Sequence, residues 1–337
     1  MLAIILHNKH AANPVLNNER RIMQIGRYDF SCTLLGNALL PPYKGSTFRG
    51  AFGGALKRAV CVVRQQECLT CLLGSCCIYA QTFESGSRIS KNGTPQASPP
   101  VPYVIEPPLD TRTRYSEGSP FDFSLILFGD ANQALPYFVY AFEIMGESGI
   151  GKKLQGQRGR FVLNNVKSTG AVIYDAVSKK LKAPSAADVT IDQVVQNHAC
   201  SAVRFNFLTP LRLKHHNSLS SELPFHMLIR AMLRRISGLF EHFGDGEPPL
   251  DYRGLVSRAQ EITTASSHLR WHDWERYSNR QEQAMMMGGL IGSVTYCGSL
   301  EQYLPLFKLC RDLHIGKQSS FGLGLFDYEL TSAGAPS

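Results

Sequence analysis

The segment Leu313–Phe326, LHIGKQSSFGLGLF, gathers residue types that act on phosphate groups. The ordinary pKa of a histidine suits proton transfer near neutral pH, so His314 is a candidate acid or base. Lys317 could stabilise the negative charge that develops on phosphorus. The glycines whose backbone N–H groups could face an anion are Gly316, Gly322 and Gly324.

A nucleotide P-loop reads G-x-x-x-x-G-K-[ST] between a strand and a helix. In this segment the pair Gly316-Lys317 comes first, and the continuation LFDYEL alternates like a strand. The pattern excludes a P-loop and leaves two alternatives. One is a cradle for another phosphate, and the other is an ordinary glycine turn after a helix that ends near His314.

Other histidines could also transfer a proton. His226, Arg230 and Arg234 follow one another at i, i+4 spacing in a predicted helix. This stripe is either a catalytic histidine with two phosphate-binding arginines or a solvated basic face. His215 and His216 follow a predicted strand, and they are either further catalytic candidates or a solvent-exposed loop pair.

Two blocks of basic residues could hold phosphate. In RYSNRQ, Tyr277 could donate a proton while Arg276 and Arg280 bind phosphate oxygens. A structural tyrosine between surface arginines is the alternative. Lys44 and Arg49 flank a predicted helix N-terminus, where phosphate binds easily, although a positively charged surface helix would look the same.

Five cysteines fall within CVVRQQECLTCLLGSCC, at a density that favours metal binding over a set of buried thiols. Structural zinc takes four ligands, and a C-x2-C pair is its usual sequence mark. An iron–sulfur cluster is the lesser alternative. Since thiolates would fill all four positions, we expect a structural zinc and no catalytic metal. The candidate ligands are Cys61, Cys68, Cys71 and one of Cys76 or Cys77.

The whole-chain composition predicts a folded, cytoplasmic protein with a polyanionic partner. Of 337 residues, 44% are hydrophobic and 18% charged, which excludes a disordered chain. The formal net charge of +8 favours nucleic acid as partner. No run approaches 18 apolar residues, so we expect no membrane association. An odd count of nine cysteines without a signal sequence disfavours a secreted disulfide framework.

The periodicities predict two domains, 22–190 and 198–331, each with the element order of a βαββαβ unit. The first would carry the cysteine-rich insertion 61–84, and the second the glycine-rich loop 315–324. The predicted strands are 27–41, 121–129, 159–166, 199–214 and 284–298, and the predicted helices are 45–60, 131–146, 222–243, 251–264 and 300–313.

A short internal repeat supports this duplication. The segments IGKKLQGQRGRF and IGKQSSFGLGLF start 165 residues apart, at Ile150 and Ile315, and agree at five of twelve positions. We predict that they form the same turn in two copies, each after a helix and before a strand. The predicted fold class is therefore α+β, with tandem ferredoxin-like domains. This is also the RRM fold, whose sheet often binds single-stranded RNA.

Several blocks occur together in the order of one known family. LPPYKGSTFRGAFGGALKR, the cysteine cluster, LTPLRLK, RYSNRQ, MMMGGLIGSVTY and LHIGKQSSFGLGLF resemble the RAMP-type CRISPR-associated endoribonucleases that cut precursor CRISPR RNA. The resemblance runs from about Tyr28 to Leu330. It implies binding of CRISPR repeat RNA and metal-independent cleavage by 2′-OH attack, giving a 2′,3′-cyclic phosphate and a 5′-hydroxyl. Many relatives carry a histidine in or near the first helix of the N-terminal domain, and 45–60 has none, so that assignment does not transfer.

The leading prediction is an endoribonuclease in which His314 transfers a proton and Lys317 stabilises charge, with Tyr277 and His226 as further catalytic candidates. The alternative is a catalytically inactive RAMP subunit that binds guide RNA beside other subunits of a CRISPR effector complex. A zinc-containing DNA-binding regulator is disfavoured, because no basic recognition helix follows the cysteines.

Overall fold

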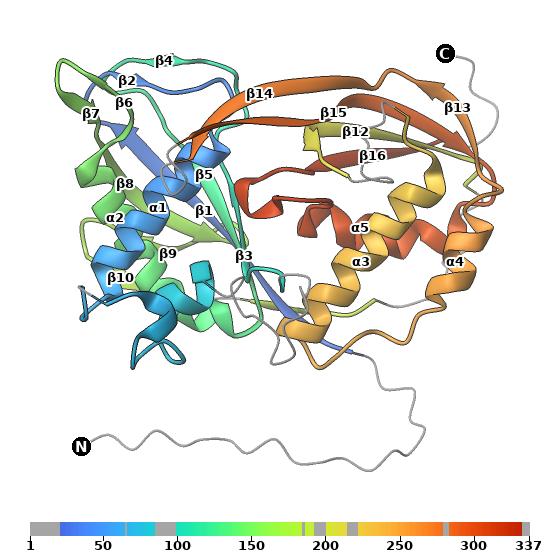
Figure 1. Ribbon diagram of the computed structural model, residues 1–337, viewed down its shortest axis with the longest axis horizontal. Helices are drawn as coiled ribbons and strands as arrows, with labels where there is room; N and C mark the ends of the chain where they lie inside the picture. The colour runs from blue at the N-terminus through green and yellow to red at the C-terminus, as the bar shows by residue number, and fades with distance from the viewer. Residues whose placement is uncertain are drawn as a thin grey trace, which may run out of the picture.

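Two lobes lie side by side, each with a β-sheet and its own helices (Figure 1). Within the described part of the chain, no helix combines the length and the apolar character needed to cross a membrane. The structure is a computed structural model that describes residues 21–64, 66–84, 99–183, 186–191, 200–213, 222–278 and 283–331.

The N-terminal lobe is built on an antiparallel sheet in which β8, β1, β5 and β3 lie in that order. Along the chain these strands and the two helices follow in the order β1, α1, β3, β5, α2, β8. This is the ferredoxin-like βαββαβ arrangement. Strands β9 and β10 extend the sheet beyond β8, and β11 pairs with the start of β1. The elements are β1 (Met23–Leu34), α1 (Gly45–Val60), β3 (Tyr103–Glu106), β5 (Phe123–Phe128), α2 (Leu135–Ser148), β8 (Phe161–Ser168), β9 (Ala171–Asp175), β10 (Lys180–Leu181) and β11 (Ala187–Val189).

Aromatic side chains fill the space between this sheet and its two helices. Alternate residues of β1 are buried, as a half-covered strand requires. The ring of Phe30 stacks on Phe123 at 4.9 Å between centroids, and Phe52 of α1 stacks on Phe142 of α2 at 4.6 Å. Each fully buried Phe contributes about 1.5–3 kcal/mol to folding, so this cluster holds α1 and α2 against the sheet.

A second, smaller sheet joins the start of α1 to an exposed hairpin. Its strands lie in the order β4, β2, β6, β7. The strands are β2 (Ala38–Leu39), β4 (Arg114–Tyr115), β6 (Ile150–Leu154) and β7 (Gln157–Gly159).

The C-terminal lobe repeats the first arrangement. Its strands lie in the order β13, β15, β12, β16, and β14 also pairs with β15 to form a long hairpin. The last helix of each lobe, α2 or α5, opens with Leu-Pro, since proline is favoured in the first turn. The elements are β12 (Ala202–Leu211), α3 (Phe225–Phe243), α4 (Tyr252–Arg258), β13 (Thr263–Ser267), β14 (Arg270–Ser278), β15 (Gln283–Cys297), α5 (Leu304–Leu313) and β16 (Phe326–Thr331).

The two lobes share one of their hydrophobic cores. Val104, Ile126 and Phe128 of the first sheet pack into the core of the C-terminal lobe. At these residues the first sheet is covered by the C-terminal lobe on the face opposite α1 and α2. Arg27 and Asp29 of β1 stay half-exposed and Val162 of β8 is exposed, so only part of the face on which an RRM commonly binds RNA is closed.

The predicted tandem ferredoxin-like fold is confirmed, with differences in detail. The helix predicted over 251–264 is wrong in its second half, because α4 ends at Arg258 and β13 starts at the β-branched Thr263. The strand predicted over 27–41 is interrupted after Leu34 and resumes as β2 in a different sheet.

Candidate functional site

The glycine-rich segment, Leu313–Phe326, lies in the contact between the lobes. Its 3-10 turn, Ser319–Phe321, packs against β3 and α1. A Cβ added at Gly322 would lie 2.7 Å from the carbonyl oxygen of Ile105, so this glycine permits the close approach to β3. Gly322 and Gly324 are both buried, with φ of 82° and 74°. These two predicted RNA-binding glycines therefore face protein.

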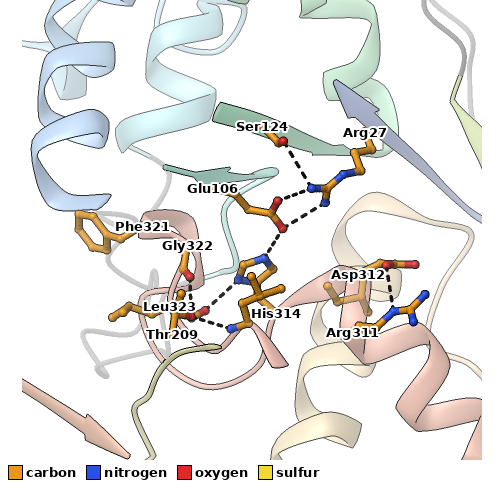
Figure 2. A network of polar contacts seen from close by, with 12 residues as sticks. Arg27, Glu106, Ser124, Thr209, Arg311, Asp312, His314, Phe321, Gly322 and Leu323 are labelled. Carbon is orange, nitrogen blue, oxygen red and sulfur yellow. Dashed lines mark hydrogen bonds and ion pairs between the residues drawn. The ribbon is translucent and has the colours of Figure 1, made fainter. Parts of the chain in front are cut away.

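His314 is fully buried in the same contact and takes part in a charged network (Figure 2). Its Nε2 lies 2.8 Å from Glu106 Oε1, and its Nδ1 lies 3.1 Å from the Leu323 carbonyl oxygen. Arg27 donates to both Glu106 oxygens, at 3.1 and 2.5 Å. Carbonyl and carboxylate oxygens accept hydrogen bonds, so both contacts of the imidazole are satisfied when both of its nitrogens carry hydrogen.

The carboxylate of Glu106 is the centre of this network. Burial by itself raises its pKa, but the hydrogen bonds and charges of His314 and Arg27 outweigh burial and lower the pKa to about 2. Glu106 ends β3 and Arg27 lies on β1, whereas His314 directly follows α5. The charged network, Arg27, Glu106 and His314, thus joins the two lobes across 208 residues of sequence.

The backbone at His314 is unusual for a histidine, with φ 57° and ψ 144°. Arg235 of α3 donates hydrogen bonds to the carbonyl oxygens of Leu313 and His314, both at 3.1 Å from Nε. A cation at a helix C-terminus satisfies carbonyls that have no partner within the helix. Burial lowers the pKa of Arg235 to about 10. These contacts hold His314 in position, and its catalytic role stays a prediction.

The two basic residues predicted at the start of α1 also contact protein. Lys44 is fully buried, and its ammonium group donates to the carbonyl oxygens of Pro42 and Asp110. The Arg49 guanidinium lies over the rings of Phe83 and Phe321, at 4.9 and 5.0 Å. RNA binding by these two residues stays a prediction.

The β14–β15 hairpin leaves the C-terminal lobe and reaches the start of α1 (Figure 1). The ring of Trp274 on β14 lies 5.3 Å from that of Tyr43, whose hydroxyl donates to the Phe321 carbonyl oxygen at 2.5 Å. His272 stacks on Trp274 at 6.1 Å and is partly exposed. The hairpin therefore brings a histidine and a tryptophan to the junction of α1 and the glycine-rich segment.

Arg212 contacts this hairpin, and Lys317 contacts the backbone of Arg212. The backbone N–H of Lys317 donates to the Arg212 carbonyl oxygen at 2.9 Å, and the Arg212 guanidinium donates to the Gly288 carbonyl oxygen at 3.3 Å. Gly288 pairs with Asp273 of β14, next to His272. The side chain of Lys317 is exposed, and those of Arg212 and His272 are partly exposed. We call Arg212, His272 and Lys317 the candidate cleavage surface.

Sequence reasoning found Lys317 but missed His272 and Arg212. In RWHDW, His272 and Trp274 are two residues apart. Residues two apart on a strand share a face, so this spacing could have indicated that His272 lies beside Trp274. Gly316, with φ 86°, is partly exposed and lies against the backbone of Arg212, at the edge of this surface.

The remaining predicted residues fall into two groups. On α3, His226 is partly buried, and Arg230 and Arg234 are exposed. The backbone of β14 includes Arg276 and Tyr277, but their side chains lie outside the described part of the protein. His215, His216 and Arg280 also lie outside the described residues.

The cysteine-rich insertion follows α1 as short turns. Burial raises the pKa of the Cys68 thiol, and the neighbouring Cys61 and Cys77 add to the effect, which places these thiols near one another. Among the residues that the structure describes, however, no three Cys, His, Asp or Glu side chains are arranged to hold a metal ion. Zinc binding stays a prediction, which elemental analysis of the purified protein would test.

Comparison with known families gives two matches along the chain. Residues 23–186 match a family model described as an N-terminal domain (AF_1859_N). Residues 205–326 match the family model of the CRISPR-associated endoribonuclease Cas6. An uncharacterised protein of Archaeoglobus fulgidus is 26% identical over 289 residues, which cover 85% of this chain and 92% of that protein.

Solved structures share the fold. A Thermus thermophilus Cas6 superposes with a TM-score of 0.51 at 14% identity, covering 91% of this chain and 99% of that one. A chain from a partial Cas6-RT-Cas1–Cas2 complex superposes with a TM-score of 0.55 at 12% identity. That match covers 94% of this chain and 47% of the other, so this chain spans about half the length of that relative. The resemblance to RAMP-type CRISPR-associated endoribonucleases is confirmed.

Proposed function

From its relation to the Cas6 endoribonucleases, we propose that this chain binds CRISPR repeat RNA and cleaves precursor CRISPR RNA. The observation that carries the proposal is the candidate cleavage surface. There His272 stacks on Trp274, which contacts Tyr43, Arg212 donates to a carbonyl oxygen of the same hairpin, and Lys317 contacts the backbone of Arg212. Cleavage proceeds by attack of a ribose 2′-hydroxyl on the adjacent phosphate, giving a 2′,3′-cyclic phosphate and a 5′-hydroxyl without a catalytic metal.

The reaction needs a base for the 2′ proton, an acid for the leaving 5′ oxygen, and positive charge at phosphorus. His272 is partly exposed and supplies one of the two proton transfers. Lys317 and Arg212 bind the phosphate that is attacked. Tyr277 lies on the same hairpin as His272 and is the candidate for the second proton transfer.

Trp274 and Tyr43 extend this surface with aromatic rings. Unpaired RNA bases stack on such rings, which positions the strand without reading its sequence. In this proposal His314 acts as a positioning residue, since its two ring nitrogens contact Glu106 and Leu323. His226 belongs to α3, and we propose it as an alternative proton donor only if His272 proves dispensable.

The experiment is cleavage of end-labelled repeat RNA in excess EDTA by wild type, His272→Ala and Lys317→Ala, with the product ends mapped. We expect His272→Ala to lower kcat by about 10²–10⁴-fold, the usual contribution of a general acid or base. His242→Ala is the matched control, because His242 is exposed at the far end of α3, and it should leave cleavage unchanged.

The outcomes separate the candidate mechanisms. Unchanged cleavage by His272→Ala would remove this residue from the mechanism and direct attention to Tyr277, His226 and His314. Wild-type protein that binds repeat RNA without cutting it would favour an inactive RAMP subunit that holds guide RNA. In either role we propose other CRISPR proteins as assembly partners, as in the Cas6-RT-Cas1–Cas2 relative.

A further inference from the structure

The β6–β7 hairpin is the N-terminal copy of the glycine-rich repeat. Its strands pair from Ile150↔Gly159 to Leu154↔Gln157, leaving a two-residue turn. That turn is Gln155-Gly156, with φ of 49° and 84°, as a tight hairpin turn requires. Every residue from Gln155 to Arg158 is exposed, in contrast to the buried C-terminal copy.

Two adjoining hollows lie on this hairpin. The first has a volume of about 500 Å³ and lies between the hairpin and the turn after β1, at Leu35 to Asn37. The second has a volume of about 310 Å³ and lies toward Ser148 and Lys153. Both hollows are lined by Gln157, Arg158 and Arg160, so these side chains form the ridge between them.

Among the residues that the structure describes, the cations of the hairpin have no ion-pair partner. Lys152, Lys153, Arg158 and Arg160 are all exposed, and none of them forms an ion pair within the described residues. By contrast, the exposed Lys179 of the same lobe lies 2.5 Å from the Glu143 carboxylate. Four uncompensated charges within so short a segment repel one another, and they are stabilised when an anion binds.

The lining groups indicate which part of a nucleic acid would bind. Guanidinium groups bind phosphate oxygens through paired hydrogen bonds. The amide of Gln157 can bond to phosphate or sugar, and that of Asn37, whose Oδ1 accepts from the Glu117 N–H at 3.2 Å, can donate through its NH₂ group. Neither hollow is lined by an aromatic side chain on which a base could stack. The site therefore fits a sugar–phosphate backbone and not a particular base.

The small sheet connects this hairpin to the candidate cleavage surface. Arg114 of β4 pairs with Leu39 of β2, which pairs in turn with Lys152 of β6. Residues directly opposite one another share a face of the sheet, so Arg114 and Lys152 point to the same side, about 10 Å apart across three strands. Both side chains are exposed. Tyr43 follows β2 along the chain, and its ring contacts that of Trp274 in the β14–β15 hairpin.

We propose that the β6–β7 hairpin is a second RNA-binding site, which holds the phosphate backbone of the single-stranded RNA that flanks the cleaved repeat. This inference rests on the proposed RNA-processing function and adds the place where the substrate continues beyond the cleavage surface. It requires no sequence preference at that site.

The test uses two RNAs, the repeat with a single-stranded flank on either side and the repeat without flanks. Binding is measured by fluorescence anisotropy at several salt concentrations for wild type and Arg158→Ala/Arg160→Ala. The matched control is Arg253→Ala/Lys308→Ala, which removes two exposed cations from α4 and α5 of the other lobe. Circular dichroism checks that all three proteins are folded.

We expect the hairpin variant to bind flanked RNA about tenfold more weakly than wild type, with a salt slope smaller by about 1.4, as two lost single-strand contacts predict. Its binding and cleavage of the unflanked repeat should equal those of wild type. If the variant and the control bind flanked RNA equally well, the inference is wrong, even if the wild type cleaves.

Two further results distinguish this inference from the proposed function. If the wild type fails to cleave while the hairpin variant still loses affinity for flanked RNA, the second site stands and the proposed nuclease activity falls. If the variant loses affinity equally for flanked RNA and for duplex DNA of the same length, assignment of the site to single-stranded RNA is overturned.

Discussion

The two copies of the internal repeat start with the same backbone and end in different surroundings. After α2, Gly149 has φ 76° and ψ 159°, and after α5, His314 has φ 57° and ψ 144°. Two residues later Gly151 and Gly316 have φ of 88° and 86°. The first copy then forms an exposed hairpin, and the second packs between the lobes.

The residues that follow account for this difference. The first copy continues with KLQGQRGR, which has little to bury, and the second continues with QSSFGLGL, in which Phe321 and Leu323 are buried. Apolar side chains gain free energy when they leave water, so the second copy folds onto β3 and α1. One backbone motif thus serves as a candidate RNA contact in one lobe. In the other lobe it forms part of the buried contact between the lobes, around Glu106 and His314, which we call the joint.

The largest expected effect comes from removing the carboxylate at the centre of this joint. Glu106→Ala leaves His314 and Arg27 without their partner, and loss of one member of a buried ion pair costs about 3–5 kcal/mol. We expect a loss of about 3 kcal/mol in the free energy of unfolding in urea. Asp29→Ala is the control, since Asp29 is half-exposed and pairs with the same Arg27 at 3.4 Å, and it should cost less than about 1 kcal/mol. A similar loss in both variants would contradict the role given to burial.

Acid should weaken the same joint. The pKa of Glu106 is about 2 in the folded protein against an ordinary 4.5, so the unfolded chain takes up the proton first as the pH falls. The stabilisation is fully present above about pH 4.5 and is lost between there and pH 2, and it amounts to about 3 kcal/mol. Melting temperatures of wild type and Glu106→Gln measured from pH 7 to pH 3 should therefore converge at low pH. Parallel curves would exclude Glu106 as the titrating group.

A smaller effect tests the strained backbone at His314. Positive φ with extended ψ is adopted almost only by glycine, and another residue pays about 1–3 kcal/mol for it. Both His314→Ala and His314→Gly lose the contact with Glu106, but only the glycine relieves the strain. We expect His314→Gly to be more stable than His314→Ala by about 1 kcal/mol in chemical denaturation. The opposite order, usual within a helix, would show that the joint does not constrain this residue.

The smallest effect concerns the exposed copy. Asparagine is favoured over glutamine at the first position of a two-residue hairpin turn with positive φ. Gln155→Asn should therefore stabilise the protein by about 0.5 kcal/mol, within the range of surface substitutions. A differential scanning measurement would detect a rise of at most a few degrees. A clear fall in stability would mean that Gln155 makes contacts beyond those of the turn.

Local sequence patterns predicted the ferredoxin-like units and the exposed charge of Lys317. They could not predict the partner of His314, because Glu106 lies 208 residues earlier. The residues around each of the two give no pattern that indicates a contact with the other. They also missed His272, since RWHDWERYS becomes a strand only by pairing with β15. Short histidine-containing segments carry no sign of burial, which tertiary packing decides.

The long separation in sequence across the joint has a consequence for synthesis of the protein. The Tyr43 hydroxyl contacts the Phe321 carbonyl oxygen across 278 residues. At translation rates of about 5–20 residues per second, α1 and β3 would be on the ribosome for roughly 15–60 s before the segment that covers them is made. During that interval Arg49 lacks one of the two rings over which it lies, that of Phe321. Val104, Ile126 and Phe128 likewise lack the C-terminal core that buries them. The N-terminal lobe therefore exposes apolar sheet surface, which favours aggregation, until the C-terminal lobe has been made.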